Sequence, residues 1–200
     1  MTTSPTCAAA LKEWAVAVEA LGTGRQVLIL RKGGIREENN RFEVLFPEFL
    51  LSPSFEHQQY GLLKPEHAEA LTGVFGQAAD PDALHFRYLA KVHRAFAVSE
   101  AEELRALAPF HIWSDAYAET RLRWRPRVPL TAMVLRVFAF PAERQVPVRP
   151  EYAGCRSWLP LLDDVSSGLG TPVLDDAAFA ETADAIDRAI DAARAAVARP

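Results

Sequence analysis

The sequence predicts an α+β protein: a single domain with a mixed β-sheet flanked by helices and an appended C-terminal helix. Its 200 residues suit one domain, and a hydrophobic share of 50% with 24% charged residues is typical of globular proteins. Strand-like and helix-like segments do not alternate regularly, which disfavours a doubly wound parallel sheet. We expect a core domain over residues 1–165 and an amphipathic helix over 175–199 that packs on it.

The N-terminal part is predicted to contain two helices and two strand segments. Apolar residues recur three and four positions apart in residues 8–21, which favours a helix. The apolar, β-branched run 25–30 has strand length. Residues 42–51 indicate a strand pair or a bulged strand, because Pro47 cannot donate to a ladder. A second helix is expected over 65–78.

The middle of the chain is predicted to contain a long strand and two helices. Apolar residues alternate in 84–98, which favours a strand, although its second half also fits a helix. A helix over 99–107 begins with Ser99, and Glu102 three residues later completes a capping box. Another helix is expected over 110–124.

The C-terminal part combines one strong strand with one strong helix. Residues 130–140 are almost entirely apolar and predict a central strand. Residues 154–162 are apolar but leave strand and helix open. The alanine-rich segment 175–199 carries a narrow apolar stripe that includes Phe179 and Ile186, opposite an acidic face.

Charge is distributed unevenly along the chain. The formal net charge is −4, but residues 85–158 hold 12 Lys and Arg against 7 Asp and Glu. Residues 159–200 hold 3 basic against 8 acidic residues. A protein of this kind can attract anions at one basic place while remaining acidic elsewhere.

The densest basic run lies inside this middle segment and contains a tryptophan. Guanidinium groups bind phosphate in pairs of hydrogen bonds, and an indole ring offers a stacking surface. The run therefore predicts an anion-binding or nucleic-acid-binding site, for which single-stranded or distorted nucleic acid is the preferred ligand. The alternative is structural, with the arginines paired to acidic residues near the chain ends. The residues concerned are Arg121, Arg123, Trp124, Arg125 and Arg127.

Two shorter motifs suggest a cleft. Arg31 and Lys32 precede two glycines, and a glycine turn with two cations can hold a phosphate or carboxylate; a plain hairpin turn is the alternative. Glu56 and His57 follow an apolar strand and suit acid–base catalysis, or a loop-anchoring hydrogen bond. We expect the two motifs to lie close together, at the ends of neighbouring strands.

Four blocks of sequence carry a resemblance to a known family. They are LKEWAVAVEALGTGRQVLILRKGGIRE, FEVLFPEFLLSPSFEHQ, PLTAMVLRVFAFP and EYAGCRSWLPL. The chain resembles the domain of unknown function 1802 family over roughly residues 10–162, with the tail from about Asp175 outside it. That family occurs fused to restriction-endonuclease-like domains. The resemblance thus implies a module of a restriction-modification or defence-type system, with DNA or RNA and a separate nuclease subunit as partners.

The usual nuclease motif can be tested on the sequence itself. It needs an acidic residue two positions before a lysine, because the carboxylates hold magnesium and the lysine helps to activate water. Alanine or leucine occupies that position before all four lysines, so the motif is absent. The lysines are Lys12, Lys32, Lys64 and Lys91.

The remaining chemistry in the sequence is sparse. The histidines show no metal-ligand spacing, so we expect no metal and no cofactor. Cys7 and Cys155 fit a cytosolic thiol protein, although a single disulfide is open to them. The N-terminus lacks the features of a secretory signal, and the longest apolar runs are too short for a membrane span, so a cytoplasmic protein is expected. Three functions remain open: a nucleic-acid-associated module, a small hydrolase or transferase, and a structural or interaction protein.

Overall fold

The protein, described here from a computed structural model, is built around one mixed β-sheet. The structure describes residues 6–32, 42–56, 60–154, 156–168 and 170–198. Within them the sheet has seven strands in the order β2-β5-β4-β3-β1-β6, with β7 paired to β5. The pair β1–β3 is parallel and the other pairs are antiparallel. The strands are β1 (Thr6–Trp14), β2 (Leu28–Arg31), β3 (Glu48–Ser54), β4 (Ala83–Val98), β5 (Leu130–Pro147), β6 (Trp158–Ser166) and β7 (Thr171–Pro172).

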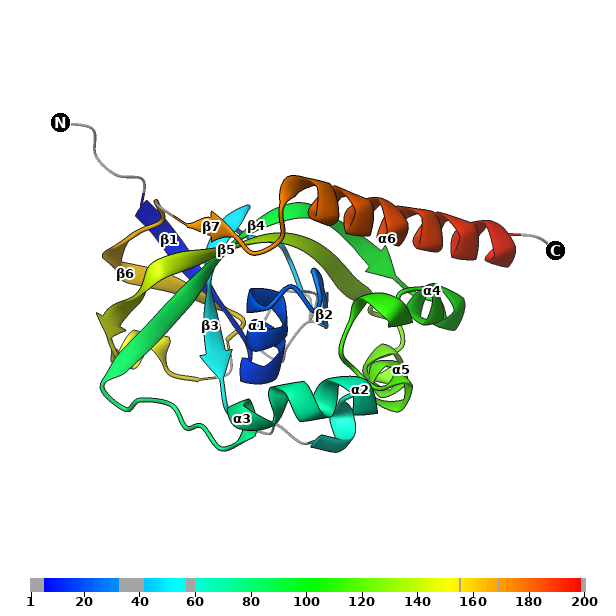
Figure 1. Ribbon diagram of the computed structural model, residues 1–200. Helices are drawn as coiled ribbons and strands as arrows, with labels where there is room; N and C mark the ends of the chain where they lie inside the picture. Colours follow the sequence, from blue (N-terminus) through cyan, green and yellow to red (C-terminus); the bar gives the residue numbers. More distant parts are fainter. Residues whose placement is uncertain (1–5, 33–41, 57–59, 155, 169, 199–200) are drawn as a thin grey trace.

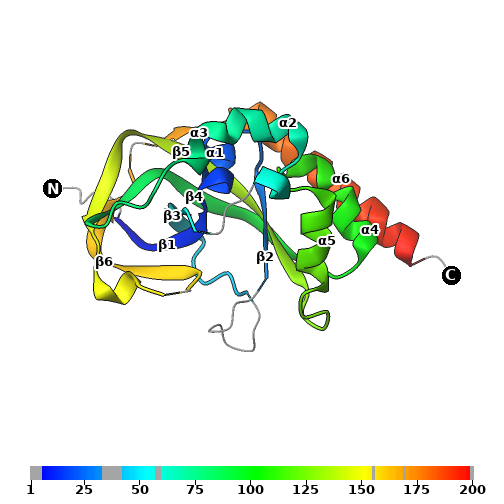
Figure 2. The same cartoon turned by 90° about the horizontal axis from the view of Figure 1, so that it is seen from below.

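Helices cover one end of this sheet and part of its outer face. Figures 1 and 2 show α4 and α5 together at the end of the molecule opposite β6, with α6 running along the outside near α4. This arrangement confirms the α+β class and the appended C-terminal helix. The α-helices are α1 (Ala15–Gly22), α2 (Pro65–Ala68), α3 (Thr72–Phe75), α4 (Ala101–Ala106), α5 (Asp115–Arg123) and α6 (Asp176–Val197).

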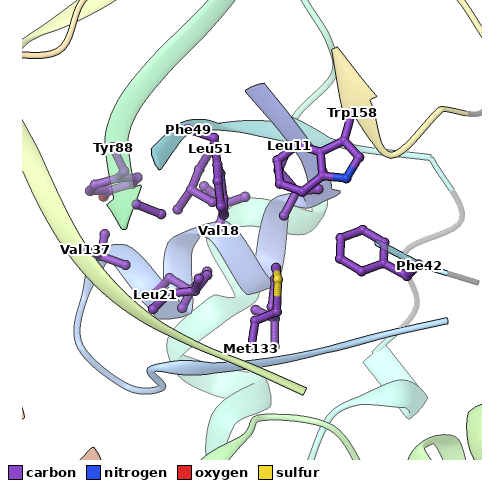
Figure 3. Packing of buried hydrophobic residues seen from close by; sticks show 13 residues of the cluster. Leu11, Val18, Leu21, Phe42, Phe49, Leu51, Tyr88, Met133, Val137 and Trp158 are labelled. Carbon is purple, nitrogen blue, oxygen red and sulfur yellow. The ribbon is translucent and has the colours of Figure 1, made fainter. Parts of the chain in front are cut away.

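The main core lies inside the curve of the sheet, around α1. Val18 and Leu21 of α1 pack in one buried cluster with side chains from strands β1 to β6, as Figure 3 shows. Phe49 and Leu51 of β3 belong to this cluster, whereas Leu50 between them belongs to a second cluster on the other face. The central strands are therefore buried on both faces.

The first predicted helix, 8–21, is wrong in its first half. Residues Thr6–Trp14 form β1, and the helix begins only at Ala15. β1 lies between β3 and β6, and Ala9, Ala10 and Leu11 are completely buried there. Small and apolar side chains without a polar face suit a strand that is buried on both faces. The apolar residues appeared three and four positions apart because the strand leads directly into the helix.

Several other predicted elements are confirmed, with shifted boundaries. The strand over 84–98 is β4, and the strand over 130–140 is the first part of β5. β5 continues to Pro147 because Pro141 lies in an irregularity, where residues 140–143 bulge out of register with β4. The segment 154–162, left open between strand and helix, contributes the start of β6.

The predicted helices also need adjustment. The segment 65–78 is broken into short turns of α- and 3₁₀-helix. The capping box of α4 is formed by Glu100 and Glu103, one residue later than Ser99 and Glu102. Glu103 is buried there and also binds Arg194 of α6, so a tertiary contact selects the cap.

The C-terminal helix α6 is held by its apolar stripe. Phe179, Ala183, Ile186 and Ile190 are buried in a cluster with residues of α4, β2, β4 and β5. An isolated helix of this composition would be marginal in water, so this burial stabilises it.

Candidate nucleic-acid interface

Most of the basic residues in the middle of the chain are neutralised by acidic partners. Arg94 and Arg136 of the sheet pair with Asp187 and Asp176 of α6. Arg149, which follows β5, pairs with Asp163 of β6, at 2.5 Å between Nη2 and Oδ1. The excess of positive charge in residues 85–158 is therefore not one continuous basic surface.

The end of α5 is different, because its arginines lie together on the surface. We call Arg121, Arg123, Trp124, Arg125 and Arg127 the arginine–tryptophan patch. The hydroxyl of Ser114 caps the start of α5 by accepting from the N–H of Tyr117. Arginines in the last turn complement the negative end of the helix dipole. Arg125 has a φ of 53° and turns the chain out of the helix.

Within this patch, the indole ring of Trp124 is contacted by two guanidinium groups. The Arg125 guanidinium carbon lies 4.6 Å and that of Arg121 5.4 Å from the ring centroid. Trp124 nevertheless remains 39% exposed. A planar base can therefore stack on the indole or on a guanidinium that covers it.

The other two arginines of the patch face solvent. The side chain of Arg123 is 78% exposed and forms a local ion pair with Glu119, at 2.8 Å. Arg127 is exposed and has no ion pair with any residue that the structure describes. Such surface pairs contribute little to stability, so these guanidinium groups are available to an anionic ligand at small cost.

Beside the patch lies a small aromatic pocket, which sequence reasoning missed. It encloses about 90 Å³ between β1, β2 and α5. The rings of Trp14, Trp113 and Tyr117 are mutual neighbours, with centroids 5.1 to 5.5 Å apart. Arg121 lines this pocket as well as contacting Trp124. The aromatic pocket is lined by Glu13, Trp14, Leu30, Arg31, Trp113, Tyr117, Ala118 and Arg121.

The electrostatics of this pocket are set by an ion pair in its wall. Arg31 donates to Glu13 at 2.8 Å and to the hydroxyl of Ser157 at 2.9 Å, and its Nε is buried without a described partner. Burial raises the pKa of the Tyr117 phenol, which lies among Arg121, Glu13 and Arg31. The pocket thus presents aromatic walls, a neutral phenol and fixed charges of both signs.

The structure places the predicted Arg31–Lys32 motif inside the protein. Arg31 joins β2 to β1 through Glu13, and its guanidinium lies 5.1 Å from the ring centroid of Phe42. Lys32 is 3% exposed and donates from Nζ to the carbonyl of Leu122 at 2.6 Å. Burial and the nearby Arg121 lower the pKa of Lys32. The two side chains thus connect the end of β2 to β1 and to α5. The two glycines that follow lie outside the described residues.

The predicted Glu56–His57 pair is described only in part. Glu56 is exposed and does not line the aromatic pocket. It also does not line a second cavity, of about 260 Å³, that lies beside α1. His57 lies outside the described residues, as does Cys155. The acid–base cleft at these residues stays a prediction. Cys7 is buried as a free thiol, and burial raises its pKa.

No helix in the described part of the chain is long and apolar enough to cross a membrane.

Comparisons with known proteins give a family and one distant structural likeness. The chain matches a family described as Domain of unknown function (DUF1802) over residues 10–185. No curated protein matches the sequence. A solved structure that is similar is that of a mutant ZmASCH protein from Zymomonas mobilis, at 10% identity and a TM-score of 0.45, covering 80% of this chain and 91% of that one. At these values the likeness carries no argument about function.

The family match corrects one expectation about the C-terminal segment. The resemblance was expected to end near residue 162, but the match continues to residue 185, into α6. The first half of this helix, with Phe179 and Ala183 in the core, is part of the family domain. Since the match spans well over half of the chain, the protein belongs to the DUF1802 family of domains of unknown function.

Proposed function

We propose that the protein binds single-stranded nucleic acid, with the phosphate backbone on the arginine–tryptophan patch and one base in the aromatic pocket. The observation that carries this proposal is the position of Arg121. Its side chain lines the pocket and also lies 5.4 Å from the centroid of Trp124, so the two features form one continuous surface.

The patch has the chemistry that a phosphate backbone requires. Arginine offers a planar set of donors that matches phosphate oxygens, and it keeps its charge at all physiological pH values. Arg123 and Arg127 project into solvent, where they can follow a flexible strand. Binding that depends on such contacts releases counterions and weakens as salt rises.

The size of the pocket favours an unpaired base. A volume of about 90 Å³ is well below the roughly 300 Å³ of sites that enclose a whole small molecule. The pocket suits one planar group, while the rest of the ligand stays outside on the patch. Bases in a duplex are stacked and paired, so a single strand presents them at lower cost.

The role in a restriction-modification or defence-type system remains part of this proposal. It follows from the association of such domains with restriction-endonuclease-like domains, and a nucleic-acid-binding surface is consistent with it. We do not propose a separate nuclease subunit, because neither the family match nor the fold supports one.

The direct test compares two double variants in a binding assay. Arg123→Gln with Arg127→Gln removes two patch charges, and both side chains are exposed. The matched control, Arg87→Gln with Lys91→Gln, removes two charges on β4 that each have one surface ion pair, with Glu19 and Glu48. Fluorescence anisotropy with a labelled single-stranded 12-mer and the corresponding duplex measures the dissociation constants.

We expect the patch variant to bind the single strand at least 10-fold more weakly, while the control variant binds like the wild type. The wild type should prefer the single strand to the duplex. Equal loss in both variants would show unspecific charge attraction, and no binding by the wild type at low salt would refute the proposal.

A second measurement tests the pocket separately from the patch. In Trp124→Phe, the tryptophans Trp14 and Trp113 still report on the pocket. Adding a nucleoside monophosphate should quench their fluorescence in a saturable way if a base stacks on them. A linear, non-saturating response would remove the pocket from the proposed site.

A further inference from the structure

A larger cavity lies beside α1. It encloses about 260 Å³, and its walls come from α1, β3, β4 and the segment 77–80. It shares no lining residue with the aromatic pocket. We call it the α1–β4 cavity. Its volume is close to the roughly 300 Å³ at which pockets begin to enclose whole small ligands.

The inner part of this cavity is apolar. Val18, Leu51 and Tyr88 belong to the main core of Figure 3 and also line the cavity, and Phe55 completes this side. Gly22 leaves room for the Tyr88 ring, since a Cβ at that position would overlap it. These apolar side chains offer a contact surface for a ligand ring.

A carboxylate in the cavity wall can accept further hydrogen bonds. Among the described residues, the ion-pair partner of Glu19 is Arg87, at a long distance of 3.4 Å between Oε2 and Nη1. Each carboxylate offers about four acceptor positions, so Glu19 retains capacity for another donor.

The mouth of the cavity carries a histidine between two carboxylates. Nδ1 of His85 lies 2.6 Å from Glu143, and Nε2 lies 2.9 Å from Asp80. Hydrogen bonds to Glu143 and Asp80 raise the pKa of His85, and the pKa values of both carboxyls are lowered. The lining thus holds the three carboxylates of Glu19, Asp80 and Glu143 against the cation of Arg87 and the ring of His85.

We propose that the α1–β4 cavity binds a small organic cation, an aromatic or aliphatic ring that bears one amine. The ring lies against Val18, Leu51 and Tyr88. The ammonium group donates to the carboxylate of Glu19. The inference is independent of nucleic-acid binding, because the two sites share no residue.

Three probes with one ring and different charge test this assignment. Benzylamine is cationic at neutral pH, benzyl alcohol is neutral, and benzoate is anionic. Chemical-shift changes of the protein amides give the dissociation constants, which for ligands of this size are on the order of 1 mM. We expect benzylamine to bind at least 5-fold more tightly than benzyl alcohol, and benzoate to bind most weakly.

Two variants locate the effect. Glu19→Gln should reduce the affinity for benzylamine to that for benzyl alcohol, while the matched control Glu48→Gln, which removes a carboxylate paired with Lys91, changes nothing. Ala79→Trp places a large ring at an exposed position in the cavity wall and should abolish binding of all three probes.

The opposite order of the probes, or unchanged benzylamine binding in Glu19→Gln, would overturn the proposal. No binding of any probe to the wild type would overturn it too. Because oligonucleotide binding is measured on separate residues, any of these results leaves the proposed function standing.

Discussion

Replacing Ile186 by alanine tests whether α6 is an integral part of the domain. Ile186 has no exposed surface and packs in one cluster with Leu104, Leu107 and Leu130. Truncating a fully buried isoleucine costs about 2–5 kcal/mol, because transfer free energy is lost and a cavity remains. For a domain of this size each kcal/mol lowers the melting temperature by roughly 2–4 °C. We therefore expect Ile186→Ala to melt about 10 °C below the wild type.

Thermal unfolding followed by circular dichroism measures this difference. The matched control is Asp184→Ala, an exposed position in the same helix, which should change the free energy of unfolding by less than about 0.5 kcal/mol. Equal melting temperatures for Ile186→Ala and the wild type would show that α6 does not stabilise the core.

Three further changes have defined outcomes. Burial, assisted by the Lys64 cation, lowers the pKa of His111 to about 4, so the folded state keeps this ring neutral. The unfolded state takes up a proton below about pH 6.5, so stability is full above that pH and falls by up to roughly 3 kcal/mol towards pH 4. In His111→Phe, melting temperatures measured across this range should lose that slope; an unchanged slope would assign it to other groups. Gly22→Ala places a Cβ inside the ring of Tyr88 and should cost about 1–3 kcal/mol in denaturant unfolding, whereas wild-type stability would show that the ring moves freely. Trp124→Ala should weaken single-strand binding by roughly 5- to 150-fold through lost stacking, with an unaltered melting temperature; unaltered affinity would exclude the indole from the interface.

The sequence predicted best where a segment had one clear period or composition. β4 alternates over its length, and α6 carries an apolar stripe, so local pattern and tertiary burial agree there. β1 was missed because it is buried on both faces and leads directly into α1. The extension of β5 was missed because Pro141 ends a regular strand but is tolerated in a bulge.

The candidate site could be predicted only in its contiguous part. Arg121 to Arg127 are neighbours in sequence, and their density indicated an anion site. The aromatic pocket joins Trp14 to Trp113, almost 100 residues away, through strand pairing that the sequence does not reveal. Arg31 and Lys32 were predicted to hold an anion at a glycine turn, but their side chains bind a glutamate on β1 and a carbonyl at the end of α5.

The salt dependence of single-strand affinity tests the central claim most directly. If three or four arginines of the patch neutralise phosphates, the logarithm of the association constant should fall with the logarithm of salt concentration at a slope of about 2–3. Arg123→Gln with Arg127→Gln should reduce this slope by about 1.4, since each lost phosphate contact removes about 0.7. A slope that is the same in the wild type and this variant would contradict the account, because the phosphates would then be bound elsewhere.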